Sequence, residues 1–198
     1  KLTARRELGL PEGRPLVASV WGSLGAAHMN EIMADFIVRA CANPFFSLIH
    51  SAGKGGYKGM VETLEKEKPD YRERGMDVRD YIYDMPRVMA AADLVLCRAG
   101  ASTLAELTAM GKPAVLIPSP NVTNNHQERN ARVLEDAGGA QVLLEGEFTA
   151  DSLLGLVSEL LHRPERLEAM SKAMKTLAVA DSTERIASLV LSLAGKGK

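Results

Sequence analysis

Short apolar runs alternate with amphipathic stretches along most of this 198-residue chain. Each apolar run has the length and pattern of a buried strand, and the six runs are 15–21, 45–50, 78–82, 94–97, 114–117 and 140–144. The stretches between them are typical of helices, expected at about 26–42, 57–66, 85–91, 102–110 and 126–137, and over most of 150–194. Parallel strands need such crossovers, and strands apolar on both faces need helices on both sides of their sheet. The sequence therefore predicts an α/β fold with a doubly wound six-stranded parallel sheet.

The chain is long enough, at 46% hydrophobic residues, to bury the core of one domain. We expect a single domain over residues 1–198, with a flexible tail at 195–198. The formal net charge of -1 shows no basic excess, so nucleic acid is not an expected partner. The first ten residues read as a helix already under way, which suggests a piece cut from a longer protein.

The compartment follows from the cysteines and from the length of the apolar runs. No run approaches the roughly 18 residues that cross a bilayer, and no signal segment precedes the first strand. Cys41 and Cys97 are far apart in apolar surroundings, without the spacing of metal ligands or of a disulfide framework. A reducing cytoplasm fits this pattern best.

The first strand-to-helix loop contains Gly22, Ser23 and Gly25. Ligands of doubly wound sheets bind at the carboxyl ends of the strands, where loops lead into helix N-termini. Backbone amides and the Ser23 hydroxyl could hold a diphosphate there, although a tight turn without a ligand would look similar. The loop lacks the G-x-G-x-x-G spacing, and the second strand ends without an acidic residue, which disfavours nicotinamide and flavin cofactors. No phosphate-binding loop of the nucleotide-triphosphatase type is present.

The stretch 92–106 gathers several polar groups at the end of one strand. Arg98 ends the strand, Gly100 turns the chain, and a helix then presents Thr103 and Glu106. A helix start suits phosphate oxygens, and the Glu106 carboxylate could accept hydrogen bonds from both ribose hydroxyls. Thr103 and Glu106 also have the spacing of a capping box, in which each side chain satisfies the other's backbone amide. Both interpretations of Glu106 remain open at this point.

The loop 119–130 is rich in amides and includes His126 and Gln127, a composition suited to the hydroxyls of an uncharged sugar, although a solvated loop would look similar. His28 and His162 read as surface groups, and His50 as a residue at the edge of a cleft. There is no D-x-D pair to hold a metal-bound sugar nucleotide, so we expect metal-independent binding without a cofactor.

Four segments together resemble the C-terminal domain of the MurG-type glycosyltransferases: 22–26, 80–85, 97–106 and 125–130. The resemblance covers nearly the whole chain. That family transfers N-acetylglucosamine from UDP to a muramyl peptide on undecaprenyl diphosphate, with a two-domain fold called GT-B. The resemblance implies that this chain is the Rossmann-like C-terminal half of such an enzyme.

The family pattern also implies roles for individual residues. The backbone of Ile82 would bind uracil with Met85 nearby, and Glu106 would hold the ribose. Ser23 and the start of the helix at Ala101, Ser102 and Thr103 would hold the diphosphate. Gln127 matches one of the family's two sugar-binding glutamines, whereas His126 matches a variant found in some members. Trp21 replaces the first glycine of the family's phosphate loop.

The family's acceptor-binding domain, its membrane-associating patch and its proposed catalytic base lie in an N-terminal half outside these residues. The resemblance therefore implies that this piece binds UDP-N-acetylglucosamine without transferring it, and that lipid I binds through the missing domain at the cytoplasmic face of the membrane. Three alternatives remain: a separate donor-binding subunit of a two-chain transferase, a non-enzymatic UDP-sugar-binding module, and a sugar-nucleotide epimerase of related fold. The epimerase needs a pair of carboxylates in its cleft, and the sequence offers no evident pair.

Overall fold

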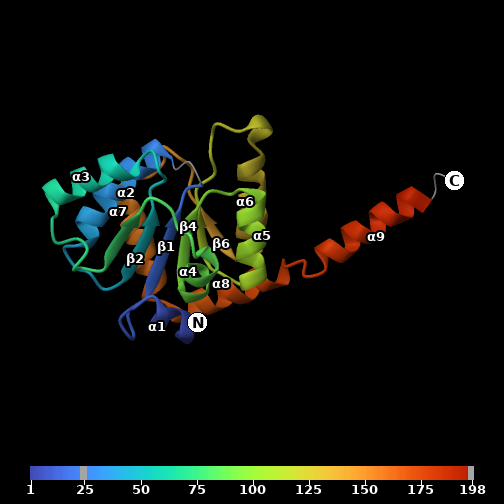
Figure 1. Cartoon of the computed structure of the whole chain (residues 1–198), viewed down its shortest axis with the longest axis horizontal. Coiled ribbons are helices and arrows are strands. Elements are labelled where there is room, and N and C mark those ends of the chain that lie inside the picture. Colours follow the sequence, from blue (N-terminus) through green and yellow to red (C-terminus); the bar gives the residue numbers. More distant parts are fainter. Residues whose placement is uncertain (23–25, 196–198) are drawn as a thin grey trace.

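The computed structural model describes residues 1–22 and 26–195. Its six strands form one sheet in the order β3-β2-β1-β4-β5-β6, and every neighbouring pair is parallel (Figure 1). The strands are β1 (Leu16–Val20), β2 (Ser47–Ser51), β3 (Met76–Arg79), β4 (Leu94–Cys97), β5 (Ala114–Leu116) and β6 (Ala140–Val142). The predicted doubly wound parallel sheet is therefore confirmed, and its order reverses between β1 and β4.

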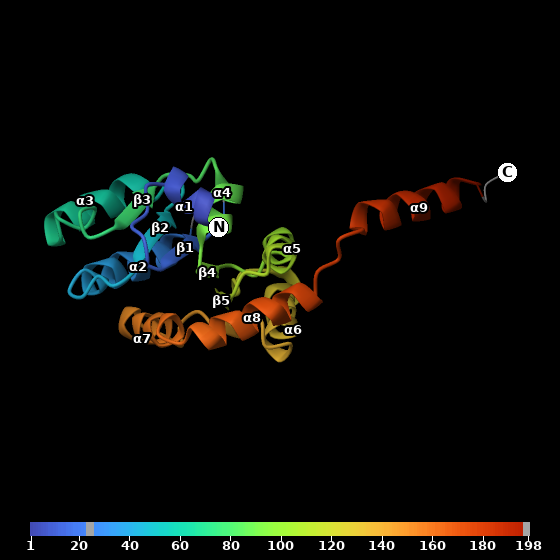
Figure 2. The same cartoon turned by 90° about the horizontal axis from the view of Figure 1, so that it is seen from below.

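Helices cover both faces of the sheet, as Figures 1 and 2 show. The core cluster on one face includes residues of α2, α3 and α7, and the cluster on the other includes residues of α4, α5 and α6. The helices are α1 (Leu2–Glu7), α2 (Ala27–Ala40), α3 (Tyr57–Glu67), α4 (Met85–Ala91), α5 (Ala101–Met110), α6 (His126–Asp136), α7 (Ala150–Leu161), α8 (Pro164–Thr176) and α9 (Ser182–Gly195), with a short 3-10 turn η1 (Thr123–Asn125) before α6. Both apolar faces of the strands are thereby removed from water, which is the main driving force for this fold.

The third strand differs from its prediction. It occupies Met76–Arg79 rather than 78–82, because Gly75, at φ +87°, turns the chain directly into the pairing of Met76 with Leu48. After Arg79 the Asp80 carboxylate accepts a hydrogen bond from the Tyr81 amide at 2.7 Å, and the chain leaves the sheet. Ile82 therefore lies in the loop between β3 and α4, at the carboxyl edge.

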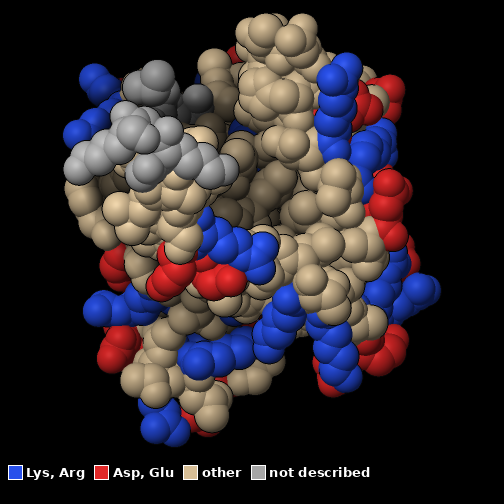
Figure 3. All heavy atoms as spheres, turned by 90° about the vertical axis from the view of Figure 1, so that its right-hand side faces the viewer, with Lys and Arg blue, Asp and Glu red and all other residues tan. Residues whose placement is uncertain are grey.

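α9 extends away from the body of the domain (Figures 1 and 2), and the side chains of residues 182–194 are exposed. Gly195 is the last residue of this helix, and the other three residues of the predicted flexible tail lie outside the described ranges, so that prediction stays untested. On the face toward which α9 extends, basic and acidic side chains are interspersed around a broad area of other residues (Figure 3). No helix among the described residues combines the length and apolarity needed to cross a bilayer.

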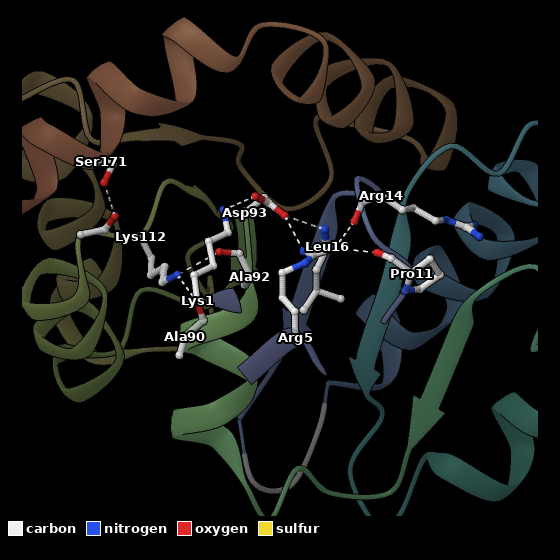
Figure 4. A network of polar contacts seen from close by, with 11 residues as sticks. Lys1, Arg5, Pro11, Arg14, Leu16, Ala90, Ala92, Asp93, Lys112 and Ser171 are labelled. Atoms are coloured by element: carbon white, nitrogen blue, oxygen red, sulfur yellow. Dashed lines mark hydrogen bonds and ion pairs between the residues drawn. The ribbon is translucent and has the colours of Figure 1, made fainter. Parts of the chain in front are cut away.

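A network of polar contacts ties the first helix to the amino-terminal edge of the sheet (Figure 4). The Asp93 carboxylate accepts hydrogen bonds from Lys1, from Arg5 at 3.2 Å and from the Leu16 amide at 2.8 Å. Beside it, the Lys112 ammonium donates to the carbonyls of residues 90 and 92 at 3.0 and 2.9 Å. The predicted initial helix is confirmed, and it packs as part of this domain.

Candidate functional site

A cleft of about 490 Å³ lies at the carboxyl ends of β1 and β4, where the strand order reverses. This switch point is where doubly wound sheets bind their ligands. The cleft is lined by Val20, Trp21, Gly22, Ala26, Ala27, His28, Arg98, Gly100, Thr103, Ser119, Asn121, Gln127 and Glu145. Five of the predicted site residues therefore meet in one cleft: Gly22, Arg98, Gly100, Thr103 and Gln127.

The helix N-termini at the cleft carry no side-chain caps. α2 starts after Ala26 and α5 after Gly100, both in extended conformation, and no side chain of the described residues caps either helix. The first amides of each helix are therefore left for another acceptor, and a helix N-terminus attracts anions. This geometry suits a diphosphate.

The capping box, one of the two interpretations left open for Thr103 and Glu106, does not form. α5 begins at Ala101, one residue earlier than expected, so Gly100 is the N-cap and Thr103 is already the third helical residue. Ala101, Ser102 and Glu106 are exposed on the first turns of this helix. Glu106 thus serves no capping function, which leaves its carboxylate to the ligand interpretation.

Arg98 crosses the cleft toward the next two strands. Its guanidinium forms an ion pair with Glu145 and donates hydrogen bonds of 3.2 Å to the carbonyls of Ile117 and Pro118. The sequence analysis missed Glu145, because residues 98 and 145 are far apart along the chain and no spacing pattern links them. Because this carboxylate balances the Arg98 charge, an anionic ligand would depend mainly on backbone amides.

Beneath the cleft, three buried side chains form a polar chain. The Trp21 indole N–H donates to the Ser19 hydroxyl at 2.9 Å, and the same hydroxyl lies 2.9 Å from His50 Nδ1. His50 is fully buried within β2, so its predicted position at a cleft edge is wrong. Burial lowers the pKa of His50 to about 3, so the imidazole is neutral at physiological pH.

The loop before α6 forms another wall of the cleft. Gln127 Oε1 accepts a hydrogen bond of 2.9 Å from the Ser119 amide, which holds the two ends of the loop together. Asn124 and Asn125 both have positive φ, at 55° and 50°, a conformation that asparagine tolerates better than most residues. His126 is exposed and does not line the cleft, and its Nδ1 contacts the Thr123 carbonyl at 2.9 Å.

The residues predicted to bind the nucleoside lie outside this cleft. Ile82 is buried and Met85 half-buried, and both pack in the core cluster that includes Cys97 and Leu104. Burial, together with the negative charge of Glu106, raises the pKa of the Cys97 thiol to about 12.

Two predicted site residues receive no test, and the interpretation of His28 is confirmed. Ser23 and Gly25 lie outside the described residues. His28 is exposed, as the sequence suggested, and it also lines the cleft at the start of α2. Within the described ranges, no three His, Cys, Asp or Glu side chains group closely enough to hold a metal ion.

Fold and cleft together define a Rossmann-like α/β domain with its ligand site at the switch point. The chain belongs to a family known as the glycosyltransferase family 28 C-terminal domain, which matches residues 17–186.

Individual relatives agree with this assignment. The UDP-N-acetylglucosamine--N-acetylmuramyl-(pentapeptide) pyrophosphoryl-undecaprenol N-acetylglucosamine transferase of Acetivibrio thermocellus is 42% identical over 188 residues, which are 95% of this chain and 50% of that protein. The protein of the same name from Desulforudis audaxviator is 38% identical over 98% of this chain and 52% of its own length. The crystal structure of Acinetobacter baumannii MurG has the same fold, with a TM-score of 0.77, 23% identity and coverage of 96% of this chain and 53% of that one. The chain thus spans about half the length of the relatives it matches.

Proposed function

We propose that this chain is the donor-binding half of an inverting glycosyltransferase that adds N-acetylglucosamine from UDP-N-acetylglucosamine to lipid I, giving lipid II for peptidoglycan synthesis. The observation that carries the proposal is the family match over residues 17–186, on a domain whose cleft lies at the switch point. The similarity to the N-acetylglucosamine transferases of Acetivibrio thermocellus and Desulforudis audaxviator supports the choice of donor and acceptor.

The diphosphate of the donor would bind between the starts of α2 and α5. Uncapped amides at both helix N-termini, beside Gly22 and Thr103, support this position. Ser23, by the family pattern, would add a hydroxyl. Because amides and helix dipoles meet the phosphate charge, donor binding would need no metal ion.

The nucleoside would bind beside the loop between β3 and α4. The backbone of Ile82 would pair with uracil, with Met85 packed nearby. Glu106 would accept hydrogen bonds from the ribose hydroxyls, which its exposure and its lack of a capping role support. A nucleoside attached to the diphosphate would have to lie near the α5 start.

The sugar would lie against the loop before α6. Gln127 lines the cleft with its amide oxygen engaged by the Ser119 amide, so its amide nitrogen is the group suited to donate to a sugar hydroxyl. His126 would contact the sugar after a change of side-chain position, since it points outside the cleft. Arg98 and Glu145 would shape the wall between sugar and diphosphate.

The acceptor, lipid I, would bind to an N-terminal half that also supplies the catalytic base. In that arrangement this domain orients the donor and stabilises the departing UDP, while the acceptor hydroxyl attacks the anomeric carbon directly. The exposed apolar side chains of α9, such as Ile186, Leu189 and Leu193, support a covering partner for this helix. Because the acceptor is a lipid, the whole protein would work at the cytoplasmic face of the bacterial membrane.

Calorimetric titration of the chain with UDP-N-acetylglucosamine, UDP-glucose and a dinucleotide tests the donor assignment. We expect selective binding of UDP-N-acetylglucosamine, weakened at least tenfold in Glu106→Ala because both ribose hydrogen bonds are lost. Glu184→Ala, on α9, is the matched control and should bind like the wild type. No UDP-sugar binding by the folded wild-type chain would refute the proposed function, and unchanged binding in Glu106→Ala would remove the ribose assignment.

A further inference from the structure

Trp21 occupies an unusual place for a large aromatic side chain. It follows the last residue of β1 and precedes Gly22, which has a φ of +90° and lines the cleft. Only 3% of Trp21 is exposed, so the indole lies beneath the cleft rather than within it. The chain therefore enters its first loop from a residue that is fixed in the core.

The donor and acceptor roles in the hydrogen bonds of Trp21 follow from its chemistry. An indole N–H can only donate, so the Ser19 hydroxyl is the acceptor in that pair. The hydroxyl can then donate its own proton to His50 Nδ1, which places the imidazole proton on Nε2. All three side chains are buried, and His50 Nε2 has no hydrogen-bond partner among the described residues. A buried N–H without a partner reduces stability, so packing of the sheet alone does not account for a histidine here.

The same indole contacts the other side of the cleft. Arg98 lies over the Trp21 ring, with its guanidinium carbon 5.8 Å from the ring centroid. Arg98 in turn holds the carbonyls at the end of β5 and the carboxylate of Glu145, beyond β6. A continuous series of contacts thus runs beneath the cleft from β2 through β1 and β4 to β5 and β6.

We propose that Trp21 is a positioning residue for the donor's diphosphate, held in place by Ser19 and His50. Trp21 fixes the direction of the backbone at Gly22 and the orientation of the Arg98 guanidinium. These two residues border the uncapped starts of α2 and α5. This inference rests on the proposed function, because it assumes a nucleoside diphosphate in the cleft. It assigns a role to a side chain that stands where the family pattern has glycine.

The chain contains one tryptophan, so its intrinsic fluorescence reports on this position. Titration of the folded chain with UDP should change the Trp21 emission in a saturable manner, because the diphosphate binds next to the residue. Uridine, which lacks the phosphates, should leave the emission unchanged. A saturable calorimetric signal for UDP with no change in emission would contradict the proposed position of Trp21.

Substitution of Ser19 separates positioning from stability. Ser19→Ala removes the acceptor of the indole N–H, and we expect calorimetry to show about five- to tenfold weaker binding of UDP, with uridine binding unchanged. Ser47→Ala is the matched control, since Ser47 is equally buried in the same sheet, but its hydroxyl has no partner among the described residues and lies at the opposite edge. This control should bind UDP like the wild type.

A double-mutant cycle checks that the effect passes through Trp21. Trp21→Phe keeps an aromatic ring beside Arg98 but removes the N–H, and the variant that combines it with Ser19→Ala should bind UDP no more weakly than Trp21→Phe alone. Additive losses, or wild-type UDP affinity in Ser19→Ala despite a lower melting temperature, would overturn the inference while leaving the proposed function intact. Failure of the wild-type chain to bind any UDP compound would instead refute the proposed function.

Discussion

Glu145 and Arg98 form an ion pair in the wall of the cleft, with 14% and 15% of their side chains exposed. An acidic side chain so close to the expected position of a diphosphate is unfavourable unless its charge is balanced. The pair therefore makes the cleft nearly neutral and leaves anion binding to backbone amides. It also joins the end of β4 to the segment after β6.

Neutralising Glu145 should strengthen the binding of UDP. Glu145→Gln removes the carboxylate charge, so the Arg98 charge is no longer balanced and attracts the diphosphate. The binding free energy of UDP should become more favourable by roughly 1 kcal/mol, which is about fivefold in affinity. Calorimetry at low ionic strength measures this gain, which should shrink as salt is added. Glu147→Gln, at an exposed position nearby, is the control with unchanged affinity. Weaker UDP binding in Glu145→Gln would mean that the pair is needed to hold Arg98 in place.

His50 should make the domain sensitive to acid. Burial lowers its folded-state pKa to about 3, whereas in the unfolded chain it titrates near its usual value of about 6.5. Between these values the unfolded state binds more protons, so the free energy of unfolding falls as the pH drops, by up to about 1.4 kcal/mol per pH unit. Urea unfolding between about pH 7 and pH 4 should show a shallower dependence in His50→Gln than in the wild type. The exposed His28→Gln should retain the wild-type dependence.

Lys112 should have an effect of the same sign at alkaline pH. Burial, with smaller contributions from the nearby charges of Lys1 and Lys175, lowers its pKa to about 8. Between about pH 8 and pH 10.4 the unfolded chain binds more protons than the folded one, so the free energy of unfolding rises with pH, by up to about 1 kcal/mol per pH unit. Comparison of wild type with Lys112→Met by urea unfolding isolates this contribution. An equal pH dependence in the two proteins would contradict it, and the exposed Lys66→Met serves as the control.

The sequence pattern predicted the fold well, because strands buried on both faces leave an unbroken apolar signal. The fourth strand and the fourth helix match their predicted bounds, and the sheet has the predicted class and number of strands. The β3 range was wrong because its pairing starts directly after Gly75, and apolarity alone does not show that the buried Ile82 lies in a loop rather than in the strand.

The site was predictable where it depends on strand ends and less so where it depends on side-chain partners. Gly22, Gly100 and Thr103 meet because parallel strands bring their carboxyl ends to one edge. The capping box does not form, because it needs Thr103 as the N-cap of α5, whereas the helix begins at Ala101 with Gly100 as its N-cap. The Arg98–Glu145 pair joins positions with no shared periodicity, so only the three-dimensional arrangement could identify it.

The exposed α9 has a consequence for backbone exchange. It is 14 residues long, and its described side chains bury nothing, whereas isolated helices of this length are only marginally stable in water. Its amides should therefore exchange with deuterium far faster than those of the buried β1 and β4. A partner that covers the apolar side of α9 would slow this exchange, so mass spectrometry of residues 182–195 would detect assembly with an acceptor half independently of sugar transfer.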